Sequence, residues 1–161
     1  MTVLPDCGDC TPFAESARRA YQPLLTRYGF EGVDCSSDRG GRECALMYRN
    51  GQAALLFILA DSAEGTGISQ SDAVFPDNGW SGVDGADGWY SAIGLIEYLS
   101  GKKLMTRKLM DQLMRGQVDY FTWEAALMHD WIERLMALFA PGQPRTWQDD
   151  FAKYARTRHY G

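Results

Sequence analysis

The sequence predicts an α+β fold in a single domain, residues 1–161. Two apolar runs surround Asn50-Gly51, a dipeptide suited to a two-residue type I′ turn, so residues 44–61 are expected to form a β-hairpin. Apolar residues on either side of this hairpin recur at helical spacing. A chain of this length fits one domain with one sizeable core. We therefore expect an N-terminal helix, a small antiparallel sheet built on the hairpin, and C-terminal helices packed on the sheet.

An amphipathic helix is expected directly after a short N-terminal tail, residues 1–10. Thr11 can cap this helix, with Pro12 at its first position, and Gly29 ends it. Its apolar positions are Phe13, Ala17, Ala20, Tyr21, Leu24, Leu25 and Tyr28. Such a stripe is typical of a helix that buries one face.

Three strands are expected to form an antiparallel meander. A short strand over residues 32–37 precedes a turn and then the hairpin. A two-residue hairpin turn would pair Cys44 with Phe57, and a four-residue loop before the hairpin would pair Cys35 with Cys44. Both faces of the hairpin are apolar near its turn, so helices or loops must cover both.

A segment rich in Gly, Ser and Asp, residues 62–88, separates the sheet from the C-terminal helices. It is expected to be a loop, with one further strand considered around residues 67–75. Loops of this length in a compact domain are often functional.

The helical part of the chain, residues 89–157, is expected to hold four helices. Gly101, Gly116 and Pro141 mark the ends of the first three. A capping-box spacing from Thr146 begins the last one. The expected helices cover residues 89–99, 104–115, about 120–139, and a final short stretch through Tyr154.

Charge is distributed unevenly along the chain. The formal net charge is −5, from 16 basic and 21 acidic residues, which disfavours nucleic acid as the direct partner. Residues 61–101, the acidic segment, contain no Lys, Arg or His. Their acids are Asp61, Glu64, Asp72, Asp77, Asp84, Asp87 and Glu97. This segment is therefore a candidate contact surface for a basic partner.

The N-terminus indicates a cytoplasmic protein. It has no basic residue followed by an apolar run, so no signal peptide is expected. The longest uncharged apolar run, residues 52–60, is too short to span a bilayer, and no membrane contact is expected. In the cytoplasm the four cysteines are expected to be thiols rather than disulfides.

The cysteines admit two kinds of chemistry. Cys7 and Cys10 have the spacing of a redox dithiol before a helix, but no strand precedes them. Together with Cys35 and Cys44 they would supply four zinc ligands, at irregular spacing. The simpler interpretation is an exposed N-terminal pair and two small buried residues, with no metal or cofactor.

His129 and Glu133 stand one helical turn apart. This spacing could hold a metal or pair an acid with a base, although a solvated ion pair is the simpler interpretation. The sequence has no nucleophile elbow, phosphate loop or dinucleotide fingerprint. We therefore do not expect an enzyme. The alternative is a small metal-dependent or thiol-dependent enzyme that uses this pair or Cys7 and Cys10.

The aromatic residues Trp80, Trp89 and Tyr90 lie within the acidic segment. Aromatic rings beside carboxylates suit a protein interface, because rings bury area while the charges steer a basic partner. The alternative is that these rings complete the domain's own core.

A helix ending at Tyr28-Gly29-Phe30 is followed by a weak strand, a turn, and Met47-Tyr48-Arg49-Asn50-Gly51 before an apolar strand. In this arrangement, residues 11–61 resemble small α+β immunity proteins of bacterial toxin systems. The resemblance implies a protein that neutralises a cognate toxin by binding it, commonly through an acidic surface when the toxin is a basic nuclease. A structural subunit that packs on a second copy is a further alternative.

The leading hypothesis is a non-enzymatic inhibitor with an acidic contact face. Its expected partner is a protein with a basic surface. The expected contact residues are Asp61, Glu64, Asp72, Asp77, Asp84 and Asp87, with Trp80 as an anchor.

Overall fold

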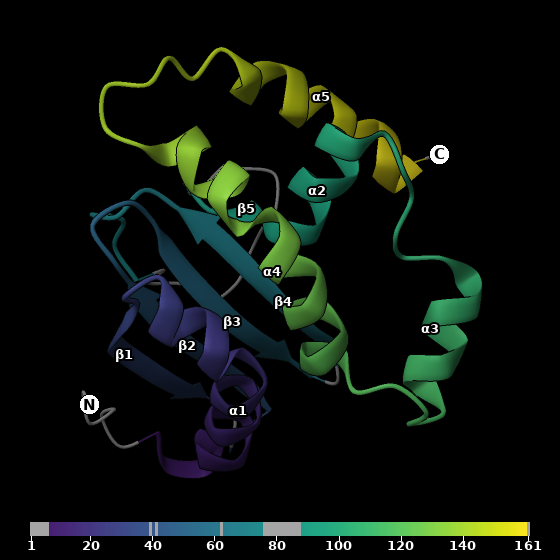
Figure 1. The fold of residues 1–161 in the computed structure, drawn as a ribbon. Coiled ribbons are helices and arrows are strands. Elements are labelled where there is room, and N and C mark those ends of the chain that lie inside the picture. Colours follow the sequence, from purple (N-terminus) through teal and green to yellow (C-terminus); the bar gives the residue numbers. More distant parts are fainter. Residues whose placement is uncertain (1–6, 39, 41, 62, 76–87, 161) are drawn as a thin grey trace.

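The fold is α+β, as predicted. The computed structural model describes residues 7–38, 40, 42–61, 63–75 and 88–160, leaving aside the side chains of 158–160. Five antiparallel strands form one sheet in chain order, each strand paired with the next (Figure 1). They are β1 (Glu31–Asp38), β2 (Glu43–Arg49), β3 (Ala54–Ala60), β4 (Ala63–Ser69) and β5 (Tyr90–Ser91). The helices are η1 (Gly8–Cys10), α1 (Thr11–Arg27), α2 (Ala92–Ser100), α3 (Arg107–Met114), α4 (Tyr120–Phe139) and α5 (Trp147–Tyr160).

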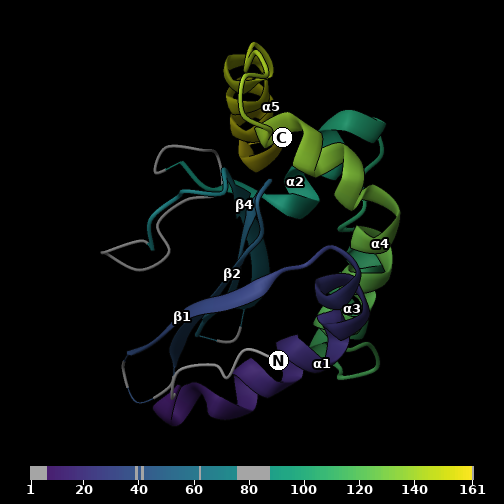
Figure 2. The same ribbon diagram turned by 60° about the vertical axis from the view of Figure 1, so that its left-hand side comes forward.

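Helices α1, α2 and α4 lie on one side of the sheet (Figure 2). Alternate strand residues point to this side, as Leu46 and Tyr48 of β2 do, and both are buried. The ring of Phe57 in β3 lies 4.6 Å from that of Tyr21 in α1 and 5.9 Å from that of Phe121 in α4, centroid to centroid. The apolar stripes of the helices and one face of the sheet therefore share the main core.

Among the described residues, the opposite face of the sheet is covered by Ala73, Phe75 and Trp89, which follow β4 and lie outside the helices. Met47, Leu56 and Ile58 point to this face and are buried together with Trp89. The indole nitrogen of Trp89 donates a hydrogen bond to the backbone oxygen of Val74 at 3.1 Å. Both faces of the apolar hairpin are thus covered, as its sequence requires.

The hairpin turn differs from the prediction. It has four residues rather than two, since Arg49 pairs with Ala54 across the turn. Asn50 closes this turn with its own side chain: its Oδ1 accepts the backbone N–H groups of Gln52 and Ala53 at 2.8 and 2.9 Å. The register therefore shifts by two residues, and each strand residue keeps its predicted face.

The register of the first two strands also differs from the prediction. Cys35 pairs with Leu46, and Cys44 pairs with Ser37, so the two cysteines are not directly opposite. A register irregularity at Val33, between Gly32 and Asp34, adds one residue to β1. Cys35 and Cys44 still share one face because the shift spans an even number of residues.

The segment expected to be a loop, residues 62–88, contains strand β4. This strand covers Ala63–Ser69 and pairs with β3 along its length, so it begins and ends earlier than the strand considered around 67–75. Gly65 and Gly67 are weak strand formers. Pairing with the buried strand β3 therefore outweighs local propensity here.

The C-terminal helices occur in the predicted number and order. Helix α4 covers the predicted range, residues 120–139, whereas α5 continues to Tyr160. Helix α2 begins after Ser91 because Tyr90 and Ser91 pair with β4. Among the described helices, none is long and apolar enough to cross a bilayer.

Helix α3 begins later than predicted. The buried carboxylate of Glu97 accepts the backbone N–H groups of Leu104 and Met105 at 2.5 and 3.1 Å, which holds this stretch outside the helix. Thr106 then caps α3, its hydroxyl accepting the Leu109 N–H at 3.2 Å. Glu97 is therefore part of the core rather than of an acidic surface.

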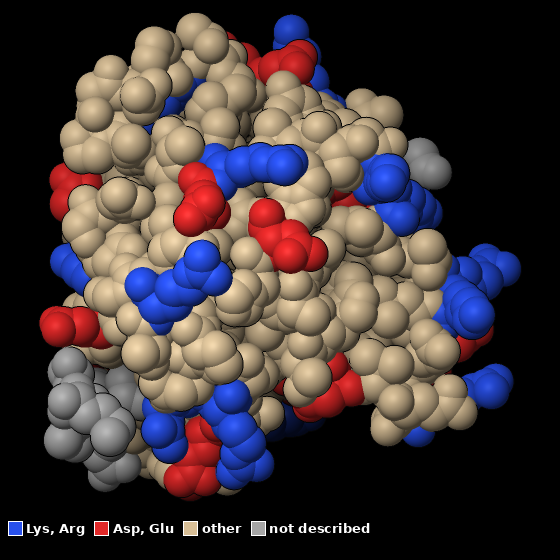
Figure 3. All heavy atoms as spheres, viewed as in Figure 1, with Lys and Arg blue, Asp and Glu red and all other residues tan. Residues whose placement is uncertain are grey.

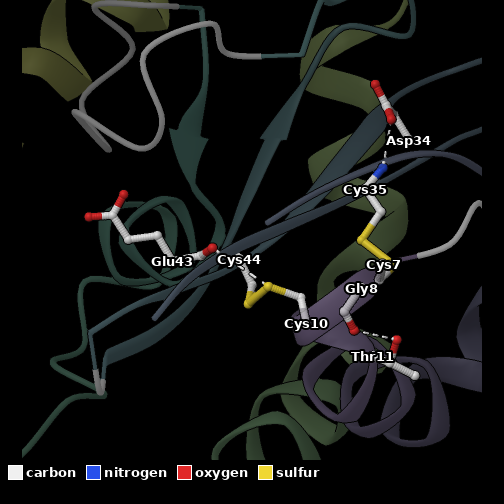
Figure 4. The surroundings of a disulfide bond; sticks show 8 residues. All are labelled: Cys7, Gly8, Cys10, Thr11, Asp34, Cys35, Glu43 and Cys44. Atoms are coloured by element: carbon white, nitrogen blue, oxygen red, sulfur yellow. Dashed lines mark hydrogen bonds between the residues drawn. A yellow bond between two sulfur atoms is a disulfide. The ribbon is translucent and has the colours of Figure 1, made fainter. Parts of the chain in front are cut away.

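Two disulfide bonds, Cys7–Cys35 and Cys10–Cys44, join the start of the first helix to β1 and β2 (Figure 4). The bonded residues have Cα atoms 5.5 and 5.7 Å apart, as disulfides require. The expectation of thiols is therefore wrong, and so is that of an exposed N-terminal pair, since Cys7 and Cys10 are both buried. The expectation of thiols rested on the predicted location, and sequence spacing did not indicate that Cys7 and Cys10, at the two ends of η1, lie against β1 and β2. A four-thiolate zinc site and a Cys7–Cys10 redox pair both need these sulfur atoms as thiols, so neither fits the disulfide-bonded chain.

Candidate functional site: a methionine-lined groove with acidic walls

Within the described chain, the predicted acidic contact residues lie near both ends of strand β4. Asp61 lies in the turn before β4 and Glu64 near the start of β4, whereas Asp72 follows its end. At about 3.3 Å per residue, the strand separates its two ends by about 20 Å. Asp61 also lies 4.0 Å from Arg42 in an exposed ion pair, which partly neutralises it.

The other predicted contact residues lie outside the described residues; they are Asp77, Trp80, Asp84 and Asp87. Their role stays a prediction. Trp89 and Tyr90, which were considered together with Trp80, are only 1% and 6% exposed. For these two, the alternative that the rings complete the core is confirmed.

A groove of about 790 Å³ lies beside Glu64, between the start of β4, helix α3 and the chain that leads into α4. Three of its lining residues are methionines. The lining residues are Ala63, Glu64, Met105, Met110, Leu113, Met114, Gly116, Val118, Asp119 and Tyr120. Methionine side chains are flexible and polarisable, which suits a surface that adapts to the shape of a partner.

Both charged residues that line the groove are acidic. The Glu64 carboxyl is half-buried, and burial raises its pKa, with the neighbouring Asp119 charge adding to the rise. Asp119 is held in place as the cap of α4, since its Oδ2 accepts the Thr122 N–H at 2.9 Å and the Thr122 hydroxyl at 2.6 Å. Two carboxyl groups that repel each other beside an apolar wall favour the approach of a cation.

Tyr120 connects the groove to a fully buried carboxylate, Glu124 of α4. The Glu124 side chain accepts hydrogen bonds from the hydroxyls of Tyr120, of Tyr21 in α1 and of Thr66 in β4. Burial raises the pKa of Glu124; the three hydroxyl donors oppose this rise and the Glu64 charge adds to it. Burial also raises the pKa of Tyr21. Glu124, Tyr21 and Thr66 are at most 4% exposed, so this cluster ties three elements together without access for a substrate.

Helix α3 forms one wall of the groove and projects from the side of the molecule (Figure 1). Met110 and Met114 of this helix are 49% and 85% exposed, whereas Leu109 is buried. Lys and Arg side chains gather over α3 at the right of Figure 3, and acidic and basic groups are otherwise interspersed on that face. The basic residues of α3 do not line the groove, whose charged walls come from β4 and the cap of α4.

His129 and Glu133 lie on an exposed part of α4, away from the residues that line the groove. Glu133 accepts a hydrogen bond from the Tyr28 hydroxyl at 3.2 Å, which links α4 to the end of α1. Within the described chain, no group of three His, Cys, Asp or Glu side chains could hold a metal ion.

Sequence reasoning missed most of the groove. Periodicity places Met105 and Met114 on an apolar helical face, which predicts burial rather than exposure. Glu64 was selected because it lies in the acidic segment, and Asp119 lies outside that segment. One usable signal was present, since Asp119 directly precedes a helical pattern and Asp is a preferred cap. The exposure of the methionines depends on α3 projecting from the core, which its own sequence does not specify.

Comparisons with protein-family models, with curated proteins and with solved structures gave no match to this chain.

Proposed function

We propose that this protein is a non-enzymatic binding protein of the immunity type, which neutralises a toxin with a basic surface. The observation that supports the proposal is the groove, whose charged lining residues, Glu64 and Asp119, are both acidic while most other lining residues are apolar. Carboxylates raise the rate at which a basic partner associates, and the apolar wall supplies buried area once the complex forms. An inhibitor needs no reaction of its own.

The place of action is part of the proposal. A cytoplasmic location, expected from the sequence, stays a prediction. The two disulfides weigh against it, because disulfides persist mainly in oxidising compartments. An oxidising compartment, or a surface exposed to one, is therefore the setting that we favour.

Co-expression tests the proposed function directly. The coding region adjacent to this protein's own would be expressed from an inducible promoter, with and without this protein. We expect the neighbouring product to arrest growth alone and this protein to relieve the arrest. A neighbour that has no effect on growth, or an arrest that this protein does not relieve, would count against an immunity role.

The purified partner tests the predicted contact residues Asp61, Glu64 and Asp72. The variant D61N/E64Q/D72N should associate more slowly, with a flatter dependence on salt, because steering by these charges is lost. The variant E15Q/E31Q/D130N makes the same change in net charge at exposed positions elsewhere. Association rates are measured by stopped-flow fluorescence. Equal slowing in both variants would attribute the effect to net charge rather than to these residues.

A further inference from the structure

Resting on the proposed function, we infer that the groove between α3 and β4 binds an amphipathic, basic helix of the partner protein. The partner helix would pack its apolar stripe on the methionines of the groove and direct Lys or Arg side chains to Glu64 and Asp119. The inference names the contact site and the kind of element that fills it.

The shape of the apolar wall favours a helix as the occupant. Met110, Leu113 and Met114 stand at positions i, i+3 and i+4 of α3, so they form one stripe along its axis. Such stripes pack against the ridges of a second helix. Helix-in-groove recognition uses anchors of this spacing, and adaptable methionine surfaces are common at such sites.

The described part of the chain does not cover this stripe, because two of its side chains are exposed to solvent. Met114 is 85% exposed and Met110 is 49% exposed, in a fold whose other methionines on β2 and α4 include fully buried side chains. Exposed apolar side chains that line a groove mark a surface used for binding more often than single ones do.

Charge complementarity identifies the occupant as basic. Glu64 and Asp119 come from different elements, β4 and the cap of α4, and both line the groove. The Asp119 charge adds to the rise in the pKa of Glu64, and a Lys or Arg placed between the two carboxylates would offset their repulsion. An acidic or neutral helix would cover both carboxylates without giving them a counter-charge.

A labelled model peptide tests the groove with the full, oxidised chain. The probe is a fluorescent helical peptide of about 16 residues, long enough to form a helix, with Leu on one face and Lys on the other. Binding is followed by fluorescence anisotropy. We expect saturable binding that weakens as salt rises, and no binding of the matched peptide in which Glu replaces Lys.

Variants locate the bound peptide. E64Q/D119N removes both groove charges but retains a side chain that can cap α4, since asparagine is also a preferred cap, and M110Q/M114Q makes the stripe polar. Each should weaken binding by about tenfold or more. The matched controls are E15Q/D130N for charge and L99Q for an exposed apolar residue. Circular dichroism melting confirms that each variant folds.

Several results would overturn the inference. These are unchanged binding in both groove variants, equal weakening in the controls, or a dimer that dissociates on M110Q/M114Q, which would identify a second copy as the occupant. The two proposals fail separately. Relief of toxin arrest by the groove variants would leave the inhibitor role standing and reject the groove. If the peptide binds the groove but the wild-type protein does not relieve the arrest, the groove stands and the inhibitor role is rejected.

Discussion

Glu124 is the residue on which the interior depends most. Its carboxylate accepts hydrogen bonds from hydroxyl groups of α1, β4 and α4, so one side chain connects two helices and the sheet. A buried carboxylate is expensive to ionise, and three hydrogen bonds offset part of that cost. The pKa of Glu124 is raised on balance, which means that the folded chain holds this proton more tightly than the unfolded chain does.

The raised pKa predicts a pH dependence of stability with a definite sign. Because the folded state binds more protons, the free energy of unfolding falls as pH rises from the unfolded pKa of Glu124 through its folded pKa. Gln cannot ionise, so E124Q should gain stability relative to wild type across the same window. Urea unfolding from about pH 4 to pH 8 measures this difference. The exposed-site variant E15Q is the control.

A constant difference between E124Q and wild type at every pH would contradict the prediction. Glu64 has a pKa shifted in the same direction, but it is present in both proteins, so its contribution is largely common to both curves.

Asn50 closes the turn between β2 and β3 with its side chain and so helps to set the register of these two strands. Its Oδ1 accepts two backbone N–H groups within the turn, and its Nδ2 donates to the Tyr28 carbonyl at 2.9 Å. N50A removes these three bonds and a fourth, from Nδ2 to the Met136 sulfur at 3.5 Å, and should lower the free energy of unfolding by about 1–3 kcal/mol. Q52A, at an exposed position of the same turn, should change it little. Chemical denaturation compares the two, and an equal loss in both variants would reject a special role for Asn50.

Among the elements, the start of α1 depends on the two disulfides for its position. Cys10 and Cys44 are both buried in the core, whereas in Cys7–Cys35 only Cys7 is buried and Cys35, on the edge strand β1, is partly exposed. The bonds close segments of 28 and 34 residues in sequence separation. By restricting the unfolded chain, each bond contributes about 2–4 kcal/mol of stability.

We expect C10S/C44S to be less stable than C7S/C35S. Both variants lose one cross-link, but the first places two hydroxyl groups at buried positions and the second places one, because Cys35 is partly exposed. Urea midpoints of the oxidised variants measure the difference. The urea midpoint of wild type treated with a reductant should lie below the midpoints of both variants. A midpoint that reduction leaves unchanged would show that the bonds add nothing to stability.

The helices and strands could be predicted because local signals specify them. Asp119 caps α4, Gly101 ends α2 with a left-handed backbone, and apolar periodicity defines the buried faces. The pairing of Cys7 with Cys35 could not be predicted, since it depends on where η1 meets the sheet. The strand considered around residues 67–75 was placed too late, because the glycines of β4 disfavour a strand and its partner β3 supplies the stability. The groove depends on the placement of α3, which involves contacts between distant parts of the chain.

For the whole molecule, the pairing of all four cysteines links stability to the redox environment. A domain has about 5–15 kcal/mol of total stability, and two disulfides supply a large share of such a sum. The reduced chain is therefore expected to unfold far more easily than the oxidised one, and a reducing compartment would hold much of it in a form open to proteolysis.

Because stability depends on the disulfides, we predict that the four cysteines are oxidised in the native host. Cells would be quenched in acid, their proteins alkylated with a maleimide polymer, and the chain detected by its change in mobility on a gel. We expect no shift unless the sample is reduced first, since the thiols are absent in the oxidised protein. Four added polymers without prior reduction would indicate that the chain resides in a reducing compartment. Its stability would then have to come from the Glu124 cluster and the aromatic core, and the cytoplasmic prediction would regain its basis.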